Sequence, residues 1–512
     1  MPANDSSASH SDVAVIDVGS NSVRLVLYRL DGRAVWTVFN EKVLAGLGRG
    51  LAETGRLSQD GTAEALTALR RFRALIDASR PKTVFAAATA AVREARDGAA
   101  FARRVEADTG LSLRILTGPE EAHYAGLGVI AGAPQSKGLV GDLGGASLEL
   151  VRLMDGAPET GITLPLGPFS FADSGKVDAI KVRAAVGKHL GRLPESFHTS
   201  TFNAVGGAWR NLALVQMRIS NYPLRIVHQY ALARREALDI ASFVSRQSRG
   251  SLERIEGMSK RRAESLPHAA VVLGGLIEDL DIEQVVVSAY GLREGLLFES
   301  LAPQVRGRDP LIEGCAALGG RRLVAEALGS ALEDWLAPAF GALPPVFGGR
   351  DTTLMAAACR LAEMGAQLHP DNRAELIFEQ VVRAPIPGMT HAERLFLACA
   401  VFARHASSTD FPHTEAISRL LSDERLQRAR AVGAAIRLGC DVAGRSPDLL
   451  ARTTLSITEK TVLLGAEPPW AGVLLGEQCG KRGTTLADLL GLAFEMKSLG
   501  RPARAASIAK AG

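Results

Sequence analysis

The sequence predicts an α/β protein whose duplicated α/β core, up to about residue 305, is followed by a mostly α-helical region. First, short β-rich apolar runs alternate with helical stretches along this part of the chain. Second, one short pattern occurs twice, at Asp17 and at Asp142. Third, the sequence beyond Arg308 is rich in Ala, Leu and Arg at helical spacing, with few β-branched runs.

In chain order, β-rich runs predict strands at residues 13–17, 23–28, 83–88, 113–116, 139–142 and 148–153. Helical spacing predicts helices at residues 62–80 and 120–131 between them. A second unit of the same kind continues through residues 205–218, a helix at 269–280, a strand at 284–288 and a helix opening near 291–295. We expect the last dozen residues to be frayed.

The composition excludes several classes of protein. With 512 residues, 47% hydrophobic and 22% charged, the chain is long enough for several domains and is not disordered. A net charge of +4 is too small to indicate nucleic-acid or membrane binding. The five cysteines form no C-x-x-C pair, and the polar N-terminus resembles no signal peptide. A cytosolic protein is therefore expected.

The repeated pattern consists of residues 17–22 (DVGSNS) and 142–147 (DLGGAS), which align without a gap. Each reads as a strand ending in Asp, a small polar turn and a second strand, where glycine permits close backbone approach and positive φ. Two such hairpins facing each other across a cleft would offer backbone N–H groups and hydroxyls to an oligoanion. The turn residues are Gly19, Ser20, Asn21, Ser22, Gly144, Gly145, Ala146 and Ser147. The alternative is a pair of ordinary turns.

Acidic residues beside these turns suggest a metal site. Phosphate needs neutralising, and Asp17 and Asp142 at the hairpin tips could hold Mg²⁺, partly through water. Glu149 is a third candidate ligand, because on a strand it shares a face with Ser147 while Leu148 and Leu150 face the core. The alternative for Glu149 is a solvent-facing position on an amphipathic strand.

Three further segments could take part in chemistry. Residues 117–122 (TGPEEA) read as a helix start, from which Glu120 or Glu121 could orient a water for attack on phosphorus; both could equally be dipole complements. Arg93, after a strand, could bind phosphate or be a surface residue. The Gly206–Gly207 turn could admit a nucleotide or a phosphate chain.

Taken in order, these segments resemble the exopolyphosphatases and guanosine pentaphosphate phosphohydrolases, within the actin-like (ribonuclease-H-like) ATPase superfamily. The resemblance covers about residues 13–300. It is carried by residues 15–22 (VIDVGSNS), 88–93 (ATAAVR), 118–122 (GPEEA), 140–147 (VGDLGGAS) with Glu149, and 291–295 (GLREG).

The resemblance implies a domain order and roles for single residues. The expected parts are a disordered tail (1–12), actin-like domain I (13–132), actin-like domain II (133–305) and a helical C-terminal region (306–512). Glu121 is the implied general base, Asp142 and Glu149 the acidic groups for metal and water, and Arg93 and Arg262 the arginines that contact phosphate. It also implies Mg²⁺, with Mn²⁺ as an alternative, and a homodimer.

The sequence departs from the family pattern at two places. Ala146 stands where a third glycine is common and Leu148 where Thr is common, so the affinity of the second loop for phosphate is in question. No histidine is followed by Asp, and residues 361–365 read LAEMG where a His-Asp pair is expected. Many proteins of the resembled family carry a helical domain whose His-Asp (HD) pair binds a metal. Such a metal site is therefore not expected here, and His369, His391 and His405 are interpreted as packing or surface residues.

The predicted function is metal-dependent removal of the terminal phosphate from inorganic polyphosphate, which releases orthophosphate. One alternative is hydrolysis of the 5′-phosphate of guanosine pentaphosphate, with the Gly206–Gly207 turn contacting the nucleoside. Two alternatives of other classes are a sugar kinase or actin-like nucleotide switch, and a regulator that binds polyphosphate or a nucleotide without turnover.

Overall fold

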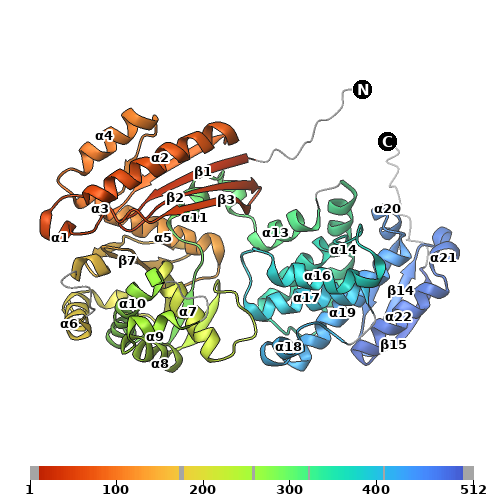
Figure 1. The fold of residues 1–512 in the computed structure, drawn as a ribbon. Helices are drawn as coiled ribbons and strands as arrows, with labels where there is room; N and C mark the ends of the chain where they lie inside the picture. The colour runs from red at the N-terminus through yellow and green to blue at the C-terminus, as the bar shows by residue number, and fades with distance from the viewer. Residues whose placement is uncertain (1–10, 172–177, 256–259, 321–322, 407–409, 500–512) are drawn as a thin grey trace, which may run out of the picture. The chain divides into compact units, whose positions relative to one another are not determined.

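A computed structural model of the chain describes residues 11–171, 178–255, 260–320, 323–406 and 410–499; side chains at residues 260–262 and 323–326 are not described. The chain divides into two compact units (Figure 1). The first comprises residues 1–310 and 387–389, and the second residues 311–386 and 390–512.

The first sheet of the first unit has the order β3-β2-β1-β4-β5. Its strands are β1 (Ser11–Val18), β2 (Val23–Asp31), β3 (Ala34–Val43), β4 (Thr83–Ala88) and β5 (Arg114–Ile115). The helices along this part are α1 (Leu51–Thr54), α2 (Gln59–Ser79), α3 (Ala90–Glu94), α4 (Gly98–Thr109) and α5 (Gly118–Gly132). β1 and β2 are antiparallel, whereas β4 and β5 continue the sheet in parallel.

Both faces of this sheet are buried at β1, whose successive side chains point to opposite faces. Ile16 packs in a core with Phe72 of α2 and Phe101 of α4. Val15, its neighbour, packs on the other face in a core with Tyr124 of α5, and with residues of α11 (Leu292–Ser300). Asp17 has the parity of Val15, so β1 carries a carboxylate near its end, on the face that α5 covers.

The second sheet has the order β11-β12-β10-β6-β7-β8, with β9 also paired to β7. Its strands are β6 (Gly138–Leu143), β7 (Leu148–Met154), β8 (Ala157–Pro158), β9 (Ile162–Leu164), β10 (Thr201–Val205), β11 (Tyr230–Ala233) and β12 (Gln284–Val287). The remaining helices of the unit are α6 (Ala179–Leu190), α7 (Gly207–Ile219), α8 (Arg234–Ser245), α9 (Arg249–Glu253), α10 (Lys260–Asp279) and α12 (Pro303–Arg306).

The two sheets share a connection pattern. In each, an antiparallel hairpin (β1–β2 or β6–β7) is followed by a parallel strand beside the first hairpin strand, β4 or β10. This repeat is the one expected from the DVGSNS and DLGGAS segments, although descent from one duplicated domain stays a prediction. The boundaries at residues 132 and 305 also stay predictions.

Helix α5 lies between the two sheets (Figure 1). Tyr124 and Leu127 pack in the core of the first sheet, whereas Ala122 and Val129 pack against Val140 and other residues of the second sheet. The helix therefore has almost no free face, and polar residues in its first turn lie close to both sheets.

The second unit is mostly helical, as expected. Its helices are α13 (Pro310–Gly319), α14 (Leu323–Gly341), α15 (Asp351–Arg360), α16 (Arg373–Arg383), α17 (His391–His405), α18 (Thr414–Leu420), α19 (Asp423–Val442), α20 (Pro447–Leu450), α21 (Pro468–Leu474) and α22 (Glu477–Leu490). It also contains a sheet that the sequence reading missed, of order β13-β14-β15: β13 (Thr453–Ile457), β14 (Thr461–Ala466) and β15 (Ala493–Ser498). His391 is buried, which agrees with a packing role, and His369 is exposed.

The structure tests the expectations for the two chain ends only in part. Residues 1–10 and 500–512 lie outside the described residues. Within the predicted tail 1–12, Ser11 and Asp12 are the first residues of β1, where they pair with Leu30 and Arg29. The tail expectation is therefore wrong for these two residues.

Candidate active site

The two hairpin turns have the same local geometry and meet each other. Gly19 N–H donates to Ser22 O at 2.9 Å, and Gly144 N–H donates to Ser147 O at 2.9 Å. A Cβ placed on Gly145 would lie 3.0 Å from Ser20 Cβ, so the loops are in contact. At Gly145 the absence of a side chain allows the two turns to approach each other closely. The expected use of positive φ is wrong, because Gly19, Gly144 and Gly145 all lie outside the left-handed region.

The strands behind these turns place charges at equivalent positions. In the first hairpin, Asp17 stands opposite Arg24. In the second, Asp142 stands opposite Glu149 at the same register position. The first hairpin therefore carries a carboxylate and a guanidinium, while the second carries two carboxylates. Glu149 is 3% exposed, so the alternative of a solvent-facing residue is wrong.

Asp17 and Asp142 lie in one electrostatic field. Desolvation by the surrounding protein raises the pKa of Asp142 to about 6, and the charge of Asp17 adds to this effect while Arg210 opposes it. Desolvation also raises the pKa of Asp17, although Arg293, whose Nη1 lies 4.0 Å from Asp17 Oδ2, opposes it. Two carboxylates from different sheets thus share one site.

Four basic side chains surround these carboxylates, and the sequence reading proposed none of them as ligands. Arg24 comes from β2, Lys42 from β3, Arg210 from α7 and Arg293 from α11. Burial, together with the charges of Arg293 and Arg210, lowers the pKa of Arg24 to about 10. Because these cations repel one another, an anion between them would be stabilised.

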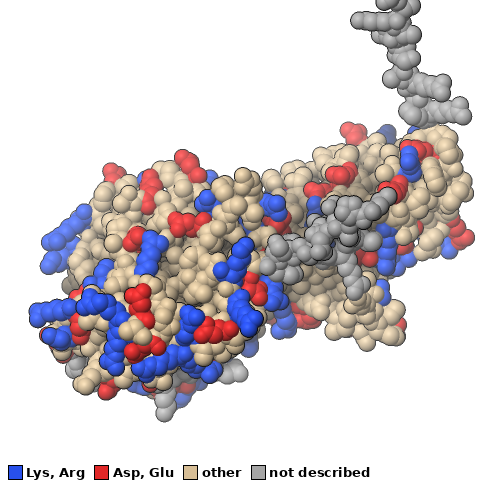
Figure 2. All heavy atoms as spheres, turned by 90° about the horizontal axis from the view of Figure 1, so that it is seen from above, with Lys and Arg blue, Asp and Glu red and all other residues tan. Residues whose placement is uncertain are grey.

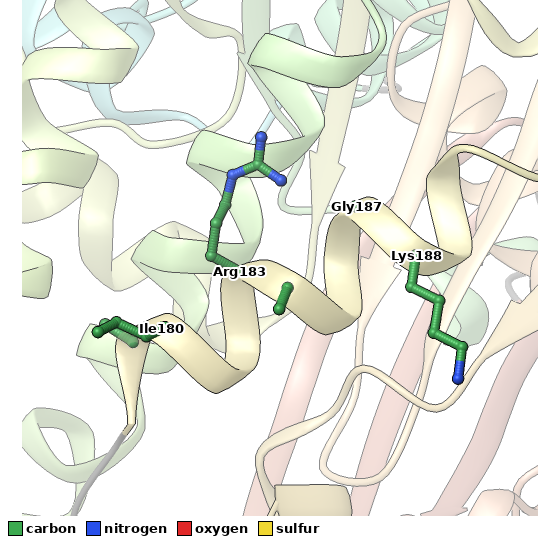
Figure 3. A pocket seen from close by; sticks show the side chains of 6 residues that line it. Ile180, Arg183, Gly187 and Lys188 are labelled. Carbon is green, nitrogen blue, oxygen red and sulfur yellow. The ribbon is translucent and has the colours of Figure 1, made fainter.

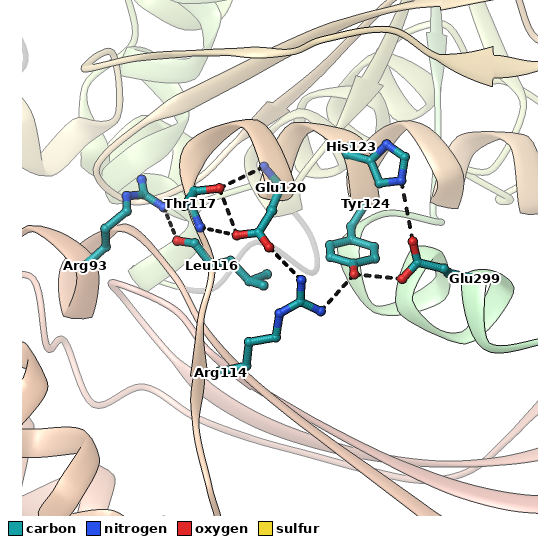
Figure 4. A network of polar contacts seen from close by, with 8 residues as sticks. All are labelled: Arg93, Arg114, Leu116, Thr117, Glu120, His123, Tyr124 and Glu299. Atoms are coloured by element: carbon teal, nitrogen blue, oxygen red, sulfur yellow. Dashed lines mark hydrogen bonds and ion pairs between the residues drawn. The ribbon is translucent and has the colours of Figure 1, made fainter.

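The structure distinguishes Glu120 from Glu121, and Figure 4 shows the contacts of Glu120 with Thr117 and Arg114. Glu120 completes a capping box with Thr117, accepts from Arg114 Nη2 at 2.6 Å and is exposed. The hydrogen bonds from Thr117, then that from Arg114, lower the pKa of Glu120 to about 2. Such a carboxylate supports the helix and is a poor base near neutral pH.

Glu121 faces the site instead. It is 7% exposed and forms an ion pair with Arg93. Burial raises its pKa to about 8; Arg93 opposes this shift, whereas the charges of Asp142 and Asp17 add to it. A carboxyl group with this pKa can accept a proton near neutral pH. Its role as the general base stays a prediction.

Arg93 lies in α3, as part of the site. It donates to the carbonyl oxygen of Leu116 at 2.9 Å and to the carboxylate of Glu121. The alternative of an ordinary surface arginine is therefore wrong, since 21% of the side chain is exposed. Contact with phosphate stays a prediction.

Gly206 lies beside Asp142. It has a φ of 109°, and a Cβ there would lie 2.8 Å from Leu143 O and 3.1 Å from Asp142 Oδ1, so only glycine fits. A Cβ on Gly207 would meet nothing within 4 Å, so space is open there.

Ala146 and Arg262 are two further predicted site residues. Ala146 is 7% exposed, and its carbonyl accepts from Gly167 N–H at 3.1 Å and Ser170 Oγ at 2.6 Å. The second loop thus accommodates the methyl group of Ala146, and the hydrogen bonds from Gly167 and Ser170 hold the loop in place. Arg262 is near the start of α10, where side chains lie outside the described part of the structure.

The donor set fits a metal ion that is shared with substrate. Glu149 Oε1 is buried without a hydrogen-bond partner, and burial and then the charge of Glu121 raise the pKa of this residue. Among the described residues, no group of three or more His, Cys, Asp or Glu side chains is placed to hold a metal ion together. Mg²⁺ commonly uses one or two carboxylates together with phosphate oxygens and water. One or two of the predicted carboxylates, Asp142, Glu149 and Asp17, could therefore hold it together with substrate oxygens and water.

A hollow on the described surface lies apart from the predicted site residues. A hollow of about 520 Å³ on α6 is lined by Ala179, Ile180, Arg183, Ala184, Gly187 and Lys188, none of which is a predicted site residue (Figure 3). Basic and acidic side chains lie side by side on the face shown in Figure 2. In the described part of the chain, every helix is too short or too polar to cross a membrane.

Comparison with known proteins agrees with the geometry. Residues 26–304 match the model of the Ppx/GppA phosphatase family, and residues 322–496 match that of the exopolyphosphatase C-terminal domain. Exopolyphosphatase 1 of Mycobacterium leprae is 26% identical over 58% of this chain and 91% of its own length. Exopolyphosphatase 1 of Mycobacterium tuberculosis is 25% identical over 60% and 95%.

Solved structures share the fold of a little over half of the chain. A Ppx/GppA family member from Aquifex aeolicus superimposes with a TM-score of 0.50 at 26% identity, over 56% of this chain and 97% of that one. An exopolyphosphatase from Cytophaga hutchinsonii gives 0.51 at 20% identity, over 57% and 98%, which is a likeness of fold alone. These neighbours have the actin-like fold. The chain belongs to the Ppx/GppA phosphatase family.

Proposed function

We propose that the chain is a metal-dependent exopolyphosphatase, which hydrolyses the terminal phosphoanhydride of inorganic polyphosphate and releases orthophosphate. The observation that carries this proposal is the contact between the two hairpin turns at Ser20 and Gly145. It brings Asp17 and Asp142 into one site, in the electrostatic field of Arg24, Arg210 and Arg293. The family and the exopolyphosphatase names of its relatives support the reaction class.

In this mechanism the chain end binds between the two turns. Backbone N–H groups and the hydroxyls of Ser20 and Ser147 contact its oxygens, and Arg24 and Arg293 neutralise its charge. Glu121 takes a proton from water as the water oxygen attacks the terminal phosphorus. The bond from that phosphorus to the bridging oxygen breaks, and this oxygen stays on the shortened chain.

Arg93 holds the Glu121 carboxylate in place. Its bond to Leu116 O fixes the guanidinium against the backbone, and the ion pair then fixes the carboxylate. When bound, Mg²⁺ would neutralise phosphate charge as a Lewis acid, and one or two of the carboxylates Asp142, Glu149 and Asp17 would hold it.

The experiment is a phosphate-release assay on purified protein with long polyphosphate, tripolyphosphate, guanosine pentaphosphate and ATP, each with and without Mg²⁺. We expect release from polyphosphate that depends on Mg²⁺ and vanishes with chelator. Binding of polyphosphate without release would instead support a regulator. Transfer of phosphate to an acceptor without release would support a kinase. Mn²⁺ is expected to substitute for Mg²⁺.

Guanosine pentaphosphate is a second candidate substrate. The open space at Gly207, beside the Asp142 end of the cleft, favours it because a nucleoside needs room there. A Gly207→Leu variant should then lose activity on guanosine pentaphosphate while keeping that on polyphosphate. Equal loss on both substrates would count against this reading. The homodimer and the cytosolic location stay predictions.

A further inference from the structure

A hydroxyl group that the proposed mechanism does not use lies beside Glu149. Thr163 of β9 is the register partner of Glu149 of β7, in an antiparallel pair. On its other side, Glu149 is paired with Asp142 of β6. Because directly paired residues point to the same face of a sheet, these three side chains form one row across the second sheet. The row begins at the candidate active site and ends at Thr163.

Two oxygen atoms of this row are buried without a hydrogen-bond partner in the described part of the chain. They are Glu149 Oε1 and Thr163 Oγ1. The hydroxyl of Ser147 hydrogen-bonds the Glu149 carboxylate, so Oε1 is the oxygen that is left for another partner. Buried polar atoms normally have a partner, which is often an ordered water molecule. One water between Oε1 and Oγ1 would satisfy both atoms.

The first turn of α5 lies directly on Thr163. A Cβ placed on Gly118 would lie 1.8 Å from Thr163 Oγ1, so the hydroxyl occupies the space that any other side chain at position 118 would fill. One turn further along the helix, a Cβ on Gly161 would lie 2.3 Å from Ala122 Cβ. The face of α5 that carries Gly118 and Ala122 therefore packs on β9 and the residue before it.

Glu121 lies on the same side of α5. Residues three apart in a helix are neighbours, so Glu121 follows Gly118 on one face. Helical side chains also lean toward the N-terminus, which directs the Glu121 carboxylate back toward Gly118 and Thr163. The charge of Glu121 adds to the effect of burial in raising the pKa of Glu149, which agrees with this placement. The base, a second carboxyl group and a hydroxyl thus surround one position.

The hydrogen-bonding capacity of water determines what a molecule at this position would do. Water donates two hydrogen bonds and accepts two. If Glu149 is ionised, the water donates to Glu121 and Glu149 and accepts from Thr163. If Glu149 carries a proton, the water accepts from Glu149 and donates to Glu121 and Thr163. One lone pair is left in both cases, because a hydroxyl can either donate or accept. That lone pair can attack phosphorus.

We propose that Thr163 is a further catalytic residue, whose hydroxyl holds the attacking water between Glu121 and Glu149. This inference rests on the proposed function, because the water is the one that hydrolyses the terminal phosphoanhydride. The covalent step is unchanged: the water oxygen bonds to phosphorus, one of its protons passes to Glu121, and the bridging oxygen leaves with the shortened chain. Thr163 keeps its own proton and fixes which lone pair of the water faces the phosphorus.

The test compares Thr163→Ser with Thr163→Ala, two variants that differ by one oxygen atom. Both remove the same methyl group, so the difference between them reports the hydroxyl alone. We expect Thr163→Ser to keep most of the wild-type kcat for phosphate release from long polyphosphate. Thr163→Ala should lower kcat by about tenfold or more with little change in KM, because the lost hydrogen bond is to the reacting water and not to the substrate.

Thermal unfolding and a Mg²⁺ titration separate this role from two others. Because Thr163 Oγ1 has no protein partner in the described chain, we expect the two variants to have the same Tm. A lower Tm for Thr163→Ala alone would show a structural hydroxyl and overturn the proposal. The Mg²⁺ concentration that gives half-maximal turnover should also be the same. A higher value for Thr163→Ala would make the hydroxyl a metal ligand, which also overturns the proposal.

A double-mutant cycle tests the link to Glu121. In a Glu121→Gln background, kcat should differ between Thr163→Ser and Thr163→Ala by a much smaller factor, because groups that act on one water are not additive. An undiminished factor would overturn the proposal. Wild-type turnover with equal kcat for the two single variants would overturn the role of Thr163 and leave the proposed function standing. If the wild type releases no phosphate from any substrate, both are overturned.

Discussion

Arg93 bridges Glu121 and the backbone: its guanidinium donates to the Glu121 carboxylate and, at 2.9 Å, to the carbonyl oxygen of Leu116. The carbonyl belongs to the segment that leads into α5, the helix that carries Glu121. Arg93 therefore sets both the position of this carboxylate and its affinity for protons. Burial raises the pKa of Glu121 to about 8 although Arg93 opposes the shift.

Replacing Glu121 by Gln should lower kcat by about 10² or more, since a general base contributes this much. Glu120→Gln is the matched control, because Gln can also complete a capping box with Thr117. We expect that variant to keep nearly all activity, and both variants to keep the wild-type circular dichroism spectrum. Steady-state phosphate release measures the effect. If Glu121→Gln turns over like the wild type, the assignment of the base is wrong.

Arg93→Gln should change the pH dependence of the reaction. A base works only when deprotonated, so kcat/KM should rise with pH through the pKa of Glu121, which is about 8 in the free protein. Removing Arg93 removes a charge that lowers this pKa, so the rising limb should move to higher pH. A pH profile of kcat/KM for both proteins measures the shift. A limb that stays in place or moves to lower pH contradicts the coupling.

The sequence predicted the hairpins and the acidic helix start because both depend on local chemistry. The alternation of apolar residues in the strands, the turn residues and the cap at Thr117 each depend only on residues that are close in sequence. It could not choose between Glu120 and Glu121. That choice depends on the rotation of α5 between two sheets, because one face of its first turn meets Arg114 and the other meets Arg93.

The basic residues of the cleft depend on contacts that are distant in sequence. Arg24, Arg210 and Arg293 come from β2, α7 and α11, which only the folded chain brings together. One signal was available, because Arg24 occupies in the first hairpin the position that Glu149 occupies in the second. Strand β15, mostly exposed and rich in polar residues, lacks the buried apolar run that would have predicted it.

Arg293→Gln should weaken binding of polyphosphate. The side chain is 12% exposed, and the charges of Glu294 and Asp17 keep it protonated despite burial, raising its pKa. Loss of a charge-assisted contact to phosphate should raise KM by about tenfold or more. Arg29→Gln is the control, because Arg29 pairs with Asp12 at an exposed position. A KM equal to that of the control would remove Arg293 from the binding site.

Adding a methyl group at Gly145 should separate the two turns. In Gly145→Ala the new Cβ would lie 3.0 Å from Ser20 Cβ and 3.2 Å from the Phe169 ring, which is too close. We expect a loss of about 1–3 kcal/mol in the free energy of unfolding, with reduced activity. In Gly144→Ala the Cβ would meet Ser147 O at an ordinary 3.5 Å, so this variant should be tolerated. Urea unfolding and phosphate release compare the two; equal behaviour would contradict the contact.

The buried carboxyl groups should make the metal-free protein less stable as the pH rises. The pKa of Asp142 is raised to about 6 and that of Glu121 to about 8, whereas in the unfolded chain both are near 4. At pH values between the unfolded and the native pKa, the native state binds more protons than the unfolded state. The contribution of these two groups to the free energy of unfolding is therefore greatest below pH 4 to 5, and it is lost as the pH rises through 6 to 8. Mg²⁺ held by Asp142 and Glu149 should restore part of it at pH 8.

Thermal unfolding in chelator, followed from pH 5 to 8.5, measures this effect as a fall of several degrees in Tm. Asp142→Asn is the comparison, because it keeps the shape of the side chain and cannot ionise. The difference between the two proteins removes the contribution of groups such as His268, whose pKa burial lowers and which therefore acts in the opposite sense. The wild type should lose more Tm than the variant over this range and should gain more from Mg²⁺ at pH 8. Parallel curves would show that Asp142 does not ionise as its surroundings require.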